Sequence, residues 1–362
     1  MSIVPTDLPI GAPQSRRRFL QITGFTAAGA MVVAACGSDE ASSDSGSGGG
    51  SGSDSATKIA LQLSWLPDTE FAPIFIADDK GYFEEEGVDV EMISGGPDIG
   101  AIEAIVGSGG ADIGIATDIF SVIAAQADGS PFVVVGGLYQ ANLHGFISPQ
   151  DAAIDEPAEL AGKRLGGAQG VQPKFEAILS LAGEDPTDYT FVPAGFGPDL
   201  VINGEVDAQS VFITDEVIAY RQQTGEEPVM MTWDELGLPS FTLVFFTTKD
   251  YLDKNRDAVK GFLKAVQMGQ VDNEADPELG ATLAAENYGK DAGLELDLEK
   301  LKNVEYLKYS NSEATEANGY LYIDPTFVET KVFPGMEAAD MTTGSVDEVI
   351  DMSLLEEIKA EG

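Results

Sequence analysis

The stretch that decides the fold, Leu63 to Val90, reads LSWLPDTEFAPIFIADDKGYFEEEGVDV. Residues 58–65, which overlap its start, alternate apolar with small or polar side chains, the period-two pattern of a strand with unlike faces. A helix is predicted from about residue 70 to 79, and Lys80-Gly81 ends it with a cation and a φ-permissive residue. A second strand begins at Val88, so the stretch predicts a β-α-β unit.

The β-α-β unit also locates a crevice. Its crossover should be right-handed, and in open α/β sheets ligands bind beside the loops that follow the carboxyl ends of the strands. Trp65, Asp68 and Phe71 lie on the first of these loops or at the start of the helix. We therefore expect these three residues at the rim of a ligand site.

The same stretch resembles a known family. The positions that carry the resemblance are Trp65, Pro67, Phe75, Ala77, Gly81-Tyr82-Phe83 and Glu86-Gly87-Val88-Asp89-Val90. They resemble the periplasmic-type solute-binding proteins of ABC importers, in the branch for thiamine-pyrimidine precursors, riboflavin, nitrate, taurine and alkanesulfonates. The similarity extends over roughly residues 58–268.

This resemblance implies an α/β, two-lobed periplasmic-binding-protein-like fold of type II, with two doubly wound lobes joined by two crossover strands. Lobe 1 is expected to comprise residues 58–143 and 247–362, and lobe 2 residues 144–246. The segments after residue 268 indicate helices that pack on the lobes, and we expect no chemistry there.

Composition limits the possible partners. The chain has 362 residues, of which 43% are apolar, enough to build two lobes. Lys and Arg number 20 against 61 Asp and Glu, which gives a formal net charge of −41. So acidic a protein repels polyanions, and neither nucleic acid nor an anionic membrane surface is expected as a partner. A monomer with a strongly hydrated surface is expected.

The N-terminal residues have the pattern of an export signal. Residues 15–20, SRRRFL, precede an apolar run and resemble a twin-arginine signal, and Val33-Ala34-Ala35-Cys36 resembles a lipobox. Residues 1–36 are therefore predicted to be a signal that ends at Cys36, the lipidated residue, rather than Cys36 being a stray buried thiol. Residues 37–57, rich in Gly, Ser and Asp, are predicted to be a flexible linker. The expected location is the outer face of the cytoplasmic membrane, with the protein anchored by lipid.

Cysteine and histidine each occur once, which excludes several chemistries. Cys36 has no partner for an internal disulfide, and neither a thiolate metal site nor a paired-histidine zinc site can be built. No metal and no cofactor are expected. His144 is expected either to make a hydrogen bond at the hinge, which we prefer, or to contact the ligand.

Candidate ligand contacts follow the predicted strands. Asp118 ends one strand and begins a helix, so it suits a helix N-cap and a ligand contact equally. Phe196 lies on a loop where it either seals the lobe or stacks on a ring. Asp215 and Glu216 resemble an acidic position of relatives that bind nitrogen heterocycles, and one of the two is expected only to cap a helix. The full set of expected contacts is Trp65, Asp68, Phe71, Asp118, Tyr139, Asn142, His144, Gln169, Gln172, Phe196, Asp215, Glu216 and Phe241.

The expected rim favours one ligand class. Sulfonate and nitrate need cationic or bidentate donors, but Lys163 and Arg164 are expected at the surface and Lys174 inside a helix start. Aromatic walls with carboxylates suit a planar heterocycle that carries N–H or amino groups. A thiamine-pyrimidine precursor is ranked first and riboflavin next. Taurine, alkanesulfonate or nitrate, held by helix N-termini, remains the alternative.

These features together predict an extracytoplasmic substrate-binding lipoprotein of an ABC importer, with a permease and an ATPase as partners and with closure of the lobes on a small molecule. A sensory binding protein is not separated from an importer by sequence. Thiamine-pyrimidine synthases, which consume a pyridoxal cofactor, resemble this fold too. Phe71 stands where their histidine is expected, and residues 240–246 contain no cysteine. The sequence therefore leads us to expect that the chain is not an enzyme.

Overall fold

The computed structural model describes residues 56–361. The predicted export signal, the lipobox with Cys36 and most of the predicted linker lie outside the described residues. Within residues 56–361, no helix combines the length and the apolar character that crossing a membrane requires.

The first sheet has five strands in the order β2-β1-β3-β10-β4. β1 is parallel to β2 and to β3, whereas β10 is antiparallel to β3 and β4. The strand bounds are β1 Thr57–Gln62, β2 Val88–Ile93, β3 Ile113–Asp118, β4 Phe132–Tyr139 and β10 Thr242–Thr248. The β-α-β unit predicted from residues 63–90 is thus present as β1, α1 (Ala72–Asp79) and β2.

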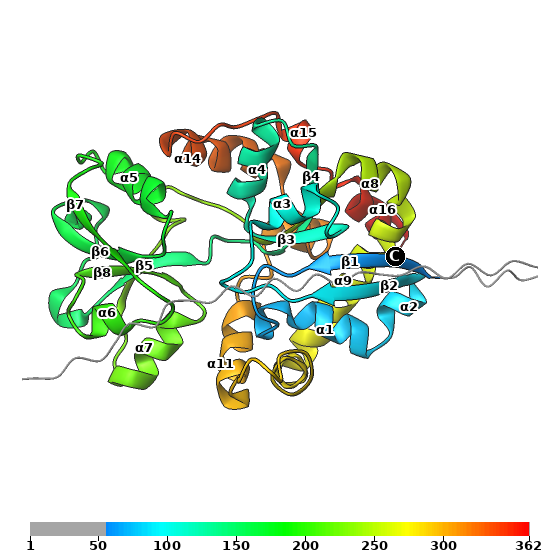
Figure 1. Cartoon of the computed structure of the whole chain (residues 1–362), viewed down its shortest axis with the longest axis horizontal. Coiled ribbons are helices and arrows are strands. Elements are labelled where there is room, and N and C mark those ends of the chain that lie inside the picture. The colour runs from blue at the N-terminus through cyan, green and yellow to red at the C-terminus, as the bar shows by residue number, and fades with distance from the viewer. Residues whose placement is uncertain (1–55, 362) are drawn as a thin grey trace, which may run out of the picture. The chain divides into compact units, whose positions relative to one another are not determined.

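The second sheet repeats this plan in the order β7-β6-β8-β5-β9. β6 is parallel to β7 and β8, and β5 is antiparallel to β8 and β9. The bounds are β5 His144–Ser148, β6 Lys163–Gly167, β7 Tyr189–Pro193, β8 Ala208–Phe212 and β9 Val229–Thr232. Residues 140–143 and residues 233–241 are the two connections between the sheets, so the predicted two-lobed α/β fold is confirmed (Figure 1).

Helices flank both sheets, as Figure 1 shows. Beside the second sheet lie α5 Gln172–Leu181, α6 Asp199–Ile202 and α7 Glu216–Thr224. Packed with the first sheet are α2 Tyr82–Glu85, α3 Ile102–Gly107, α4 Ile119–Ala127, α8 Lys249–Lys254, α9 Arg256–Ala275, α15 Val346–Val349 and α16 Ser353–Glu361. The remaining C-terminal helices are α10 Pro277–Thr282, α11 Leu296–Leu307, α12 Glu313–Asn318, α13 Pro325–Phe327 and α14 Phe333–Ala338. Short 3-10 turns occupy Thr69–Phe71 (η1), Gln150–Ala152 (η2) and Pro157–Leu160 (η3), and π-helical turns occupy Leu283–Tyr288 (η4) and Val328–Val332 (η5).

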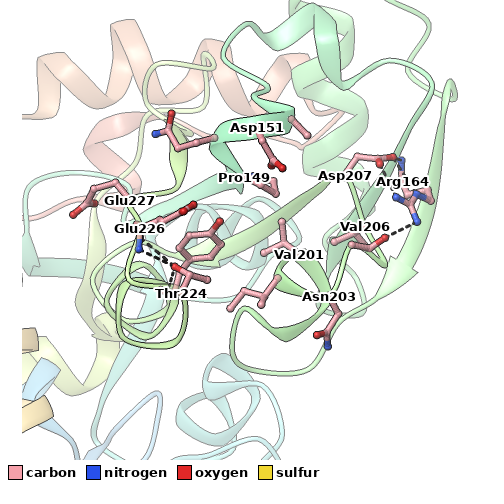
Figure 2. A pocket seen from close by; sticks show the side chains of 15 residues that line it. Pro149, Asp151, Arg164, Val201, Asn203, Val206, Asp207, Thr224, Glu226 and Glu227 are labelled. Carbon is pink, nitrogen blue, oxygen red and sulfur yellow. Dashed lines mark hydrogen bonds and ion pairs between the residues drawn. The ribbon is translucent and has the colours of Figure 1, made fainter.

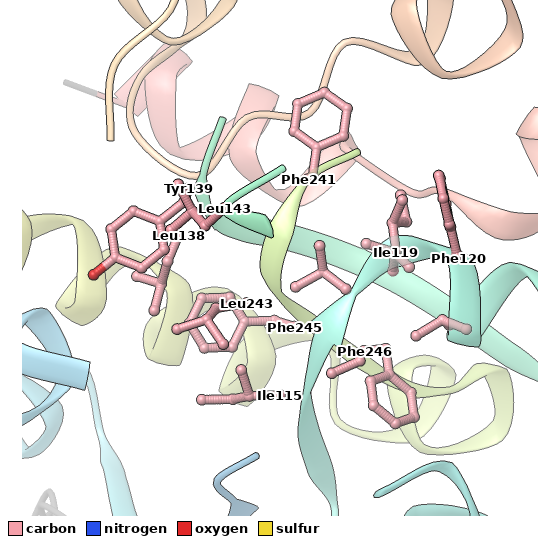
Figure 3. Close-up of a cluster of buried hydrophobic side chains, with 14 of the residues drawn as sticks. Ile115, Ile119, Phe120, Leu138, Tyr139, Leu143, Phe241, Leu243, Phe245 and Phe246 are labelled. Carbon is pink, nitrogen blue, oxygen red and sulfur yellow. The ribbon is translucent and has the colours of Figure 1, made fainter. Parts of the chain in front are cut away.

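β10 is central to the core of the first lobe because it is buried between β3 and β4 (Figure 3). Phe245 and Phe246 are fully buried, and Phe246 meets Phe132 edge-on with ring centroids 5.2 Å apart. One residue near the start of β10 departs from strand geometry: Leu243 has a φ of 53° although it is not glycine. Such a left-handed conformation costs about 1–2 kcal/mol for a residue with a Cβ.

Helix α9 packs so closely against two backbone segments of the first lobe that two residues of α9 must be glycine. A Cβ on Gly261 would stand 2.7 Å from the carbonyl oxygen of Glu86, and one on Gly269 would collide with the carbonyl oxygen of Pro73 in α1. Along the same helix, the ring of Phe262 stacks on that of Phe83 with centroids 5.6 Å apart. These contacts along α9 thus fix the position of α1. Helix α1 directly follows the loop that carries Asp68.

Gly269→Ala should lower the free energy of unfolding by about 1–3 kcal/mol, because overpacking against a backbone carbonyl outweighs the better helix propensity of alanine. Thermal and urea unfolding followed by circular dichroism measure the loss. Gly100→Ala is the matched control, since a Cβ at Gly100 meets no atom within 4 Å. Equal stability of the two variants would contradict the close approach of α9 and α1.

Candidate functional site

A cavity of about 420 Å³ lies between the two lobes. Its walls come from the loops after β1, β6, β7 and β8, from the end of β3, from the start of β5 and β10, and from α11, so most of it faces the carboxyl ends of parallel strands. The lining residues are Ser64, Trp65, Asp68, Glu70, Thr117, His144, Ala168, Val171, Gly195, Phe196, Ser210, Val211, Phe212, Asp215, Glu216, Leu243 and Lys302. We refer to it as the interlobe cavity.

A larger and shallower hollow, of about 1050 Å³, lies on the second lobe around Arg164 and Asp207 (Figure 2). Its one arginine is already engaged: Arg164 donates to both carboxylate oxygens of Asp207 and to the backbone oxygens of Gly204 and Glu205. We place the site in the smaller interlobe cavity, because buried carboxylates with incomplete hydrogen bonding are found there.

Lys302 joins three carboxylates at one end of the interlobe cavity. Its Nζ, on α11, lies 3.1 Å from Asp215 Oδ1, 3.3 Å from Glu299 Oε1 and 3.7 Å from Asp68 Oδ2. Burial alone would lower the pKa of Lys302, but Asp215, Asp68 and Glu299 together raise it above its ordinary value. Lys302 is therefore a protonated ammonium, and it links both lobes to the C-terminal helices.

The two acids before α1 are more buried than their charge would normally allow. Asp68 caps the turn η1 by accepting from the N–H of Glu70 at 3.0 Å. Burial, reinforced by Asp215, raises the pKa of Asp68 to about 8, although Lys302 opposes the shift. Glu70 is only 5% exposed, and burial raises the pKa of its carboxyl well above the ordinary value. Both acids lie at the N-terminal end of the segment that leads into α1, where the helix dipole is positive.

On the second lobe, Asp215 and Glu216 have different partners. Glu216 accepts from the N–H of Phe212 at 2.8 Å and from the N–H of Gly197 at 3.4 Å, so its carboxylate holds its own lobe together. Burial raises the pKa of Glu216 to about 7. Asp215 instead accepts from the hydroxyl of Tyr306, on α11, at 2.9 Å. Asp215 is thus the acid that contacts the first lobe.

Two aromatic residues from opposite lobes meet at the cavity. The ring centroids of Trp65 and Phe196 are 4.5 Å apart, and the ring planes are inclined by 58°. Phe196 is 66% exposed, so it can move when the lobes separate. The pair forms an apolar closure over the cavity that holds the acids.

His144 is held as a neutral ring. It stacks on Trp233 at 4.8 Å and meets Phe212 edge-on at 5.0 Å. Burial and the nearby Lys174 lower the pKa of His144 to about 4. Its backbone N–H donates to Asn142 Oδ1, and Nδ1 lies 3.2 Å from the same oxygen, so the ring proton belongs on Nδ1.

A second ion pair joins the lobes beside the cavity. Lys174 Nζ, on α5, lies 2.6 Å from Asp118 Oδ2, and the ammonium also sits over the rings of Phe120 and Trp233. Lys174 lies in the first turn of α5, as expected from the sequence, and it is not among the residues that line the interlobe cavity. The first turn of α5 lies at the lobe boundary, and the long side chain reaches across it.

The structure brings six of the predicted site residues to the interlobe cavity and places seven elsewhere. The six are Trp65, Asp68, His144, Phe196, Asp215 and Glu216. Three aromatic residues are instead part of the core: Phe71 packs edge-on against Phe75, Tyr139 donates its hydroxyl to the carbonyl of Glu70 at 2.8 Å, and Phe241 packs on Phe327. Their rings bury more apolar area inside the lobe than a cavity wall would allow.

Four predicted polar contacts also point away from the cavity. Asn142 donates to the carbonyl of Leu238 at 2.8 Å and so ties the two interlobe connections together. Asp118 is engaged by Lys174 and by the N–H of Ser121, which makes it an N-cap as well. Gln172 accepts from the N–H of Gly170, and Gln169 is exposed. Backbone groups left free by turns and helix starts compete successfully for these side chains.

Two charged residues of the cavity were missed by the sequence interpretation. Lys302 comes from α11, in the C-terminal region that was interpreted as lobe packing alone. Glu70 was placed in the first turn of a predicted helix, where an acid needs no further explanation. The only signal for Glu70 was its position two residues after Asp68, and no local pattern pointed to Lys302.

Comparison with known proteins agrees with this geometry. The sequence model of the family described as NMT1/THI5 like matches residues 68–279. The chain belongs to this family. It is 27% identical over 236 residues to 4-amino-5-hydroxymethyl-2-methylpyrimidine phosphate synthase of Schizosaccharomyces pombe, covering 62% of this chain and 67% of the relative. It is 30% identical over 238 residues to the corresponding synthase THI13 of Saccharomyces cerevisiae, covering 62% and 69%.

Solved structures confirm the fold. The aliphatic sulphonate binding protein SsuA of Escherichia coli superposes with a TM-score of 0.60 at 18% identity, covering 82% of this chain and 92% of that protein. The nitrate-binding protein NrtA of Synechocystis superposes with a TM-score of 0.54 at 16% identity, covering 84% and 89%. The resemblance to solute-binding proteins inferred from residues 63–90 is confirmed at the level of family and fold.

The comparisons correct one expectation. The conclusion that the chain is not an enzyme is wrong as an inference from its family, because relatives 27–30% identical over 62% of the chain are named as synthases. That conclusion rested on a missing histidine and missing cysteines.

The pyridoxal group implied by the synthase resemblance does not fit the lysines of this cleft as they stand. Imine formation needs a lysine that can lose its proton. Lys302 is surrounded by three carboxylates that raise its pKa, and Lys174 is paired with Asp118 at 2.6 Å. We derive no step through pyridoxal.

Asp68→Asn should make the protein increasingly stable, relative to the unchanged chain, as the pH rises from about 4 to about 8. The pKa of Asp68 is about 8 in the folded protein against an ordinary value of 3.8, so the folded state binds more protons between these values. Stability due to this group therefore falls as the pH rises through that window, and asparagine removes the dependence.

The measurement is the difference in melting temperature between the two proteins at several pH values. Asp98→Asn, at an exposed loop position, is the control and should show no such trend. A difference that stays constant or shrinks with rising pH would show that Asp68 ionises normally.

Proposed function

We propose that this chain captures a small, planar, nitrogenous ring in the interlobe cavity by closing its lobes. A thiamine-pyrimidine precursor is ranked first and riboflavin second. The observation that carries the proposal is the composition of the cavity lining, in which acidic side chains outnumber basic ones.

The charge balance speaks against an anionic guest. The carboxylates in or beside the cavity are Asp68, Glu70, Asp215, Glu216 and Glu299, and the one ammonium among the described lining residues is Lys302. None of the described lining residues carries a guanidinium group, the side chain best suited to a sulfonate or nitrate. An anion would also have to displace Lys302 from three partners. Taurine, alkanesulfonate and nitrate are therefore disfavoured.

Size and shape suit a ring. A volume of about 420 Å³ lies at the lower end of the range for small-molecule sites. Trp65 and Phe196 approach from opposite lobes, so a flat guest can stack on one or both rings. His144, neutral and with Nε2 free to accept, adds one polar group on the wall. The remaining contacts would be hydrogen bonds from the guest to carboxylates.

The wider role we propose is that of a lipid-anchored extracytoplasmic binding protein that delivers the ring to an ABC permease and its ATPase. Support comes from the export pattern, from the lipobox with Cys36 and from the glycine- and serine-rich segment after it. The fold shared with SsuA and NrtA is compatible with this role.

A second candidate function is the formation of a pyrimidine, and it is favoured by the names of the relatives. The two candidates share the ring-binding cavity and differ in the fate of the ring. Mass spectrometry of small molecules bound before and after incubation separates them: a binding protein returns the same pyrimidine, whereas a synthase yields a new one.

Titration with 4-amino-5-hydroxymethyl-2-methylpyrimidine, riboflavin, taurine and nitrate tests the proposed ligand class. We expect saturable changes in tryptophan fluorescence and a rise in melting temperature with a ring but not with either anion. Trp65→Ala and Phe196→Ala should each weaken ring binding about tenfold, since an aromatic contact is worth about 1 kcal/mol or more beyond burial. Met230→Ala, an exposed apolar position on β9, is the control. Stabilisation by the anions alone would overturn the proposal.

Lobe closure is tested through the ion pair of Lys174 and Asp118. Lys174→Met leaves a buried carboxylate without its ammonium, so we expect a loss of about 1–3 kcal/mol in stability and a larger radius of gyration in small-angle X-ray scattering. Adding Asp118→Asn should recover part of the loss. Lys163→Met, on β6, is the matched control. An unchanged radius of gyration would show that this ion pair does not hold the lobes together.

A further inference from the structure

Among the acids that line the interlobe cavity, Glu70 has the fewest hydrogen-bond partners for its carboxyl group. Its side chain is 95% buried, since only 5% is exposed, and it lines the cavity. Among residues 56–361, its Oε1 has no hydrogen-bond partner. Buried carboxyl oxygens are almost always hydrogen-bonded, because leaving one without a partner costs about 1–3 kcal/mol. An oxygen of this kind, facing a cavity, is available to a guest.

The groups around Glu70 are engaged with one another. Lys302 lies within 4 Å of Asp68, Asp215 and Glu299, and within the described part of the chain it makes no such contact with Glu70. The hydroxyl of Tyr139 is used by the backbone carbonyl of Glu70, and that of Tyr306 is used by Asp215. These three donors thus serve acceptors other than the Glu70 carboxyl.

We propose that Glu70 is a specificity-determining residue whose free Oε1 binds a positively charged N–H group of the guest, so that the cavity selects organic cations over their uncharged counterparts. This inference rests on the proposed function, since it concerns the same cavity and the same ring. It narrows the ligand from a nitrogenous ring to one that carries a protonated amino group.

The proton balance follows from the surroundings of Glu70. Burial raises the pKa of its carboxyl, and Asp68, Asp215 and Glu299 raise it further against the opposing effect of Lys302. The protonated form of Glu70 is therefore favoured in the free protein. A cationic guest stabilises the carboxylate, so the O–H bond of Glu70 breaks and the proton leaves to solvent as the guest enters. Capture of one cation is thus accompanied by release of up to one proton.

A neutral ring could instead accept a hydrogen bond from protonated Glu70. The excess of acids in the cavity favours the cation, because a cation supplies the counter-charge that an ionised Glu70 lacks. The two cases differ in their response to Glu70→Gln. Glutamine keeps a hydrogen-bond donor at this position but cannot become negative.

The test compares two pyrimidines of nearly equal shape, 4-amino-5-aminomethyl-2-methylpyrimidine, which carries an ammonium group, and its hydroxymethyl counterpart, which does not. We expect the unchanged protein to bind the ammonium compound at least tenfold more tightly. Glu70→Gln should remove that preference by lowering the affinity for the ammonium compound alone. Glu91→Gln, at an exposed position on β2, should change neither affinity.

Calorimetry in two buffers of different ionisation enthalpy measures proton release with the unchanged protein, so it does not depend on the folding of a variant. Release of a substantial fraction of one proton with the ammonium compound, and its loss in Glu70→Gln, supports the assignment. Equal affinity for the two pyrimidines, or an unchanged preference in Glu70→Gln, overturns the role of Glu70 while leaving ring capture intact. If the protein binds neither of the two pyrimidines and no other ring, the proposed function itself is overturned.

Discussion

Three carboxyl groups from different parts of the chain share one ammonium, that of Lys302; two of them, Asp68 and Glu299, are buried, and Asp215 is partly exposed. Asp68 lies before α1, Glu299 lies on α11 beside Lys302, and Asp215 lies on the second lobe. Burying several like charges is costly unless a counter-charge compensates them, so these segments can come together only when Lys302 lies between them. The C-terminal helices are therefore part of the site, and the arrangement of the two lobes depends on this cluster.

The cavity offers a guest two kinds of contact. Lys302 and its carboxylates are already paired with one another, and their hydrogen bonds extend to Tyr306 and to the N–H of Thr69. Glu70 has an acceptor without a donor, and Trp65 and Phe196 supply aromatic rings. A guest that offers both a ring and a donor would satisfy both requirements, which is how a small site obtains orientation as well as affinity.

The fold could be predicted from sequence because its signals are local. Alternation over residues 58–65, the helix before Lys80-Gly81 and the strand at Val88 define a β-α-β unit without reference to the rest of the chain.

The site could be predicted only in part. Residues that follow strands, such as Asp68 and Asp215, were found because topology places them at the crevice. Lys302 was missed because its partners Asp68 and Asp215 are distant in sequence, and Phe71 and Tyr139 were overestimated because an aromatic residue serves a core as readily as a cavity. The synthase names of the relatives show a further limit, since the presence or absence of a few residues does not settle catalysis.

The backbone of Leu243 has a consequence for movement. This residue is the second of β10, one residue beyond the segment 233–241; it lines the cavity, and its φ of 53° is one that residues other than glycine rarely adopt. The surrounding packing maintains a conformation that the residue would not choose by itself. If the adjoining segment rotates as the lobes part, Leu243 can relax to an ordinary strand conformation, and the energy released offsets some of the contacts that are lost. The protein would then alternate between two arrangements of similar free energy, so that even a weakly held guest could shift the balance between them.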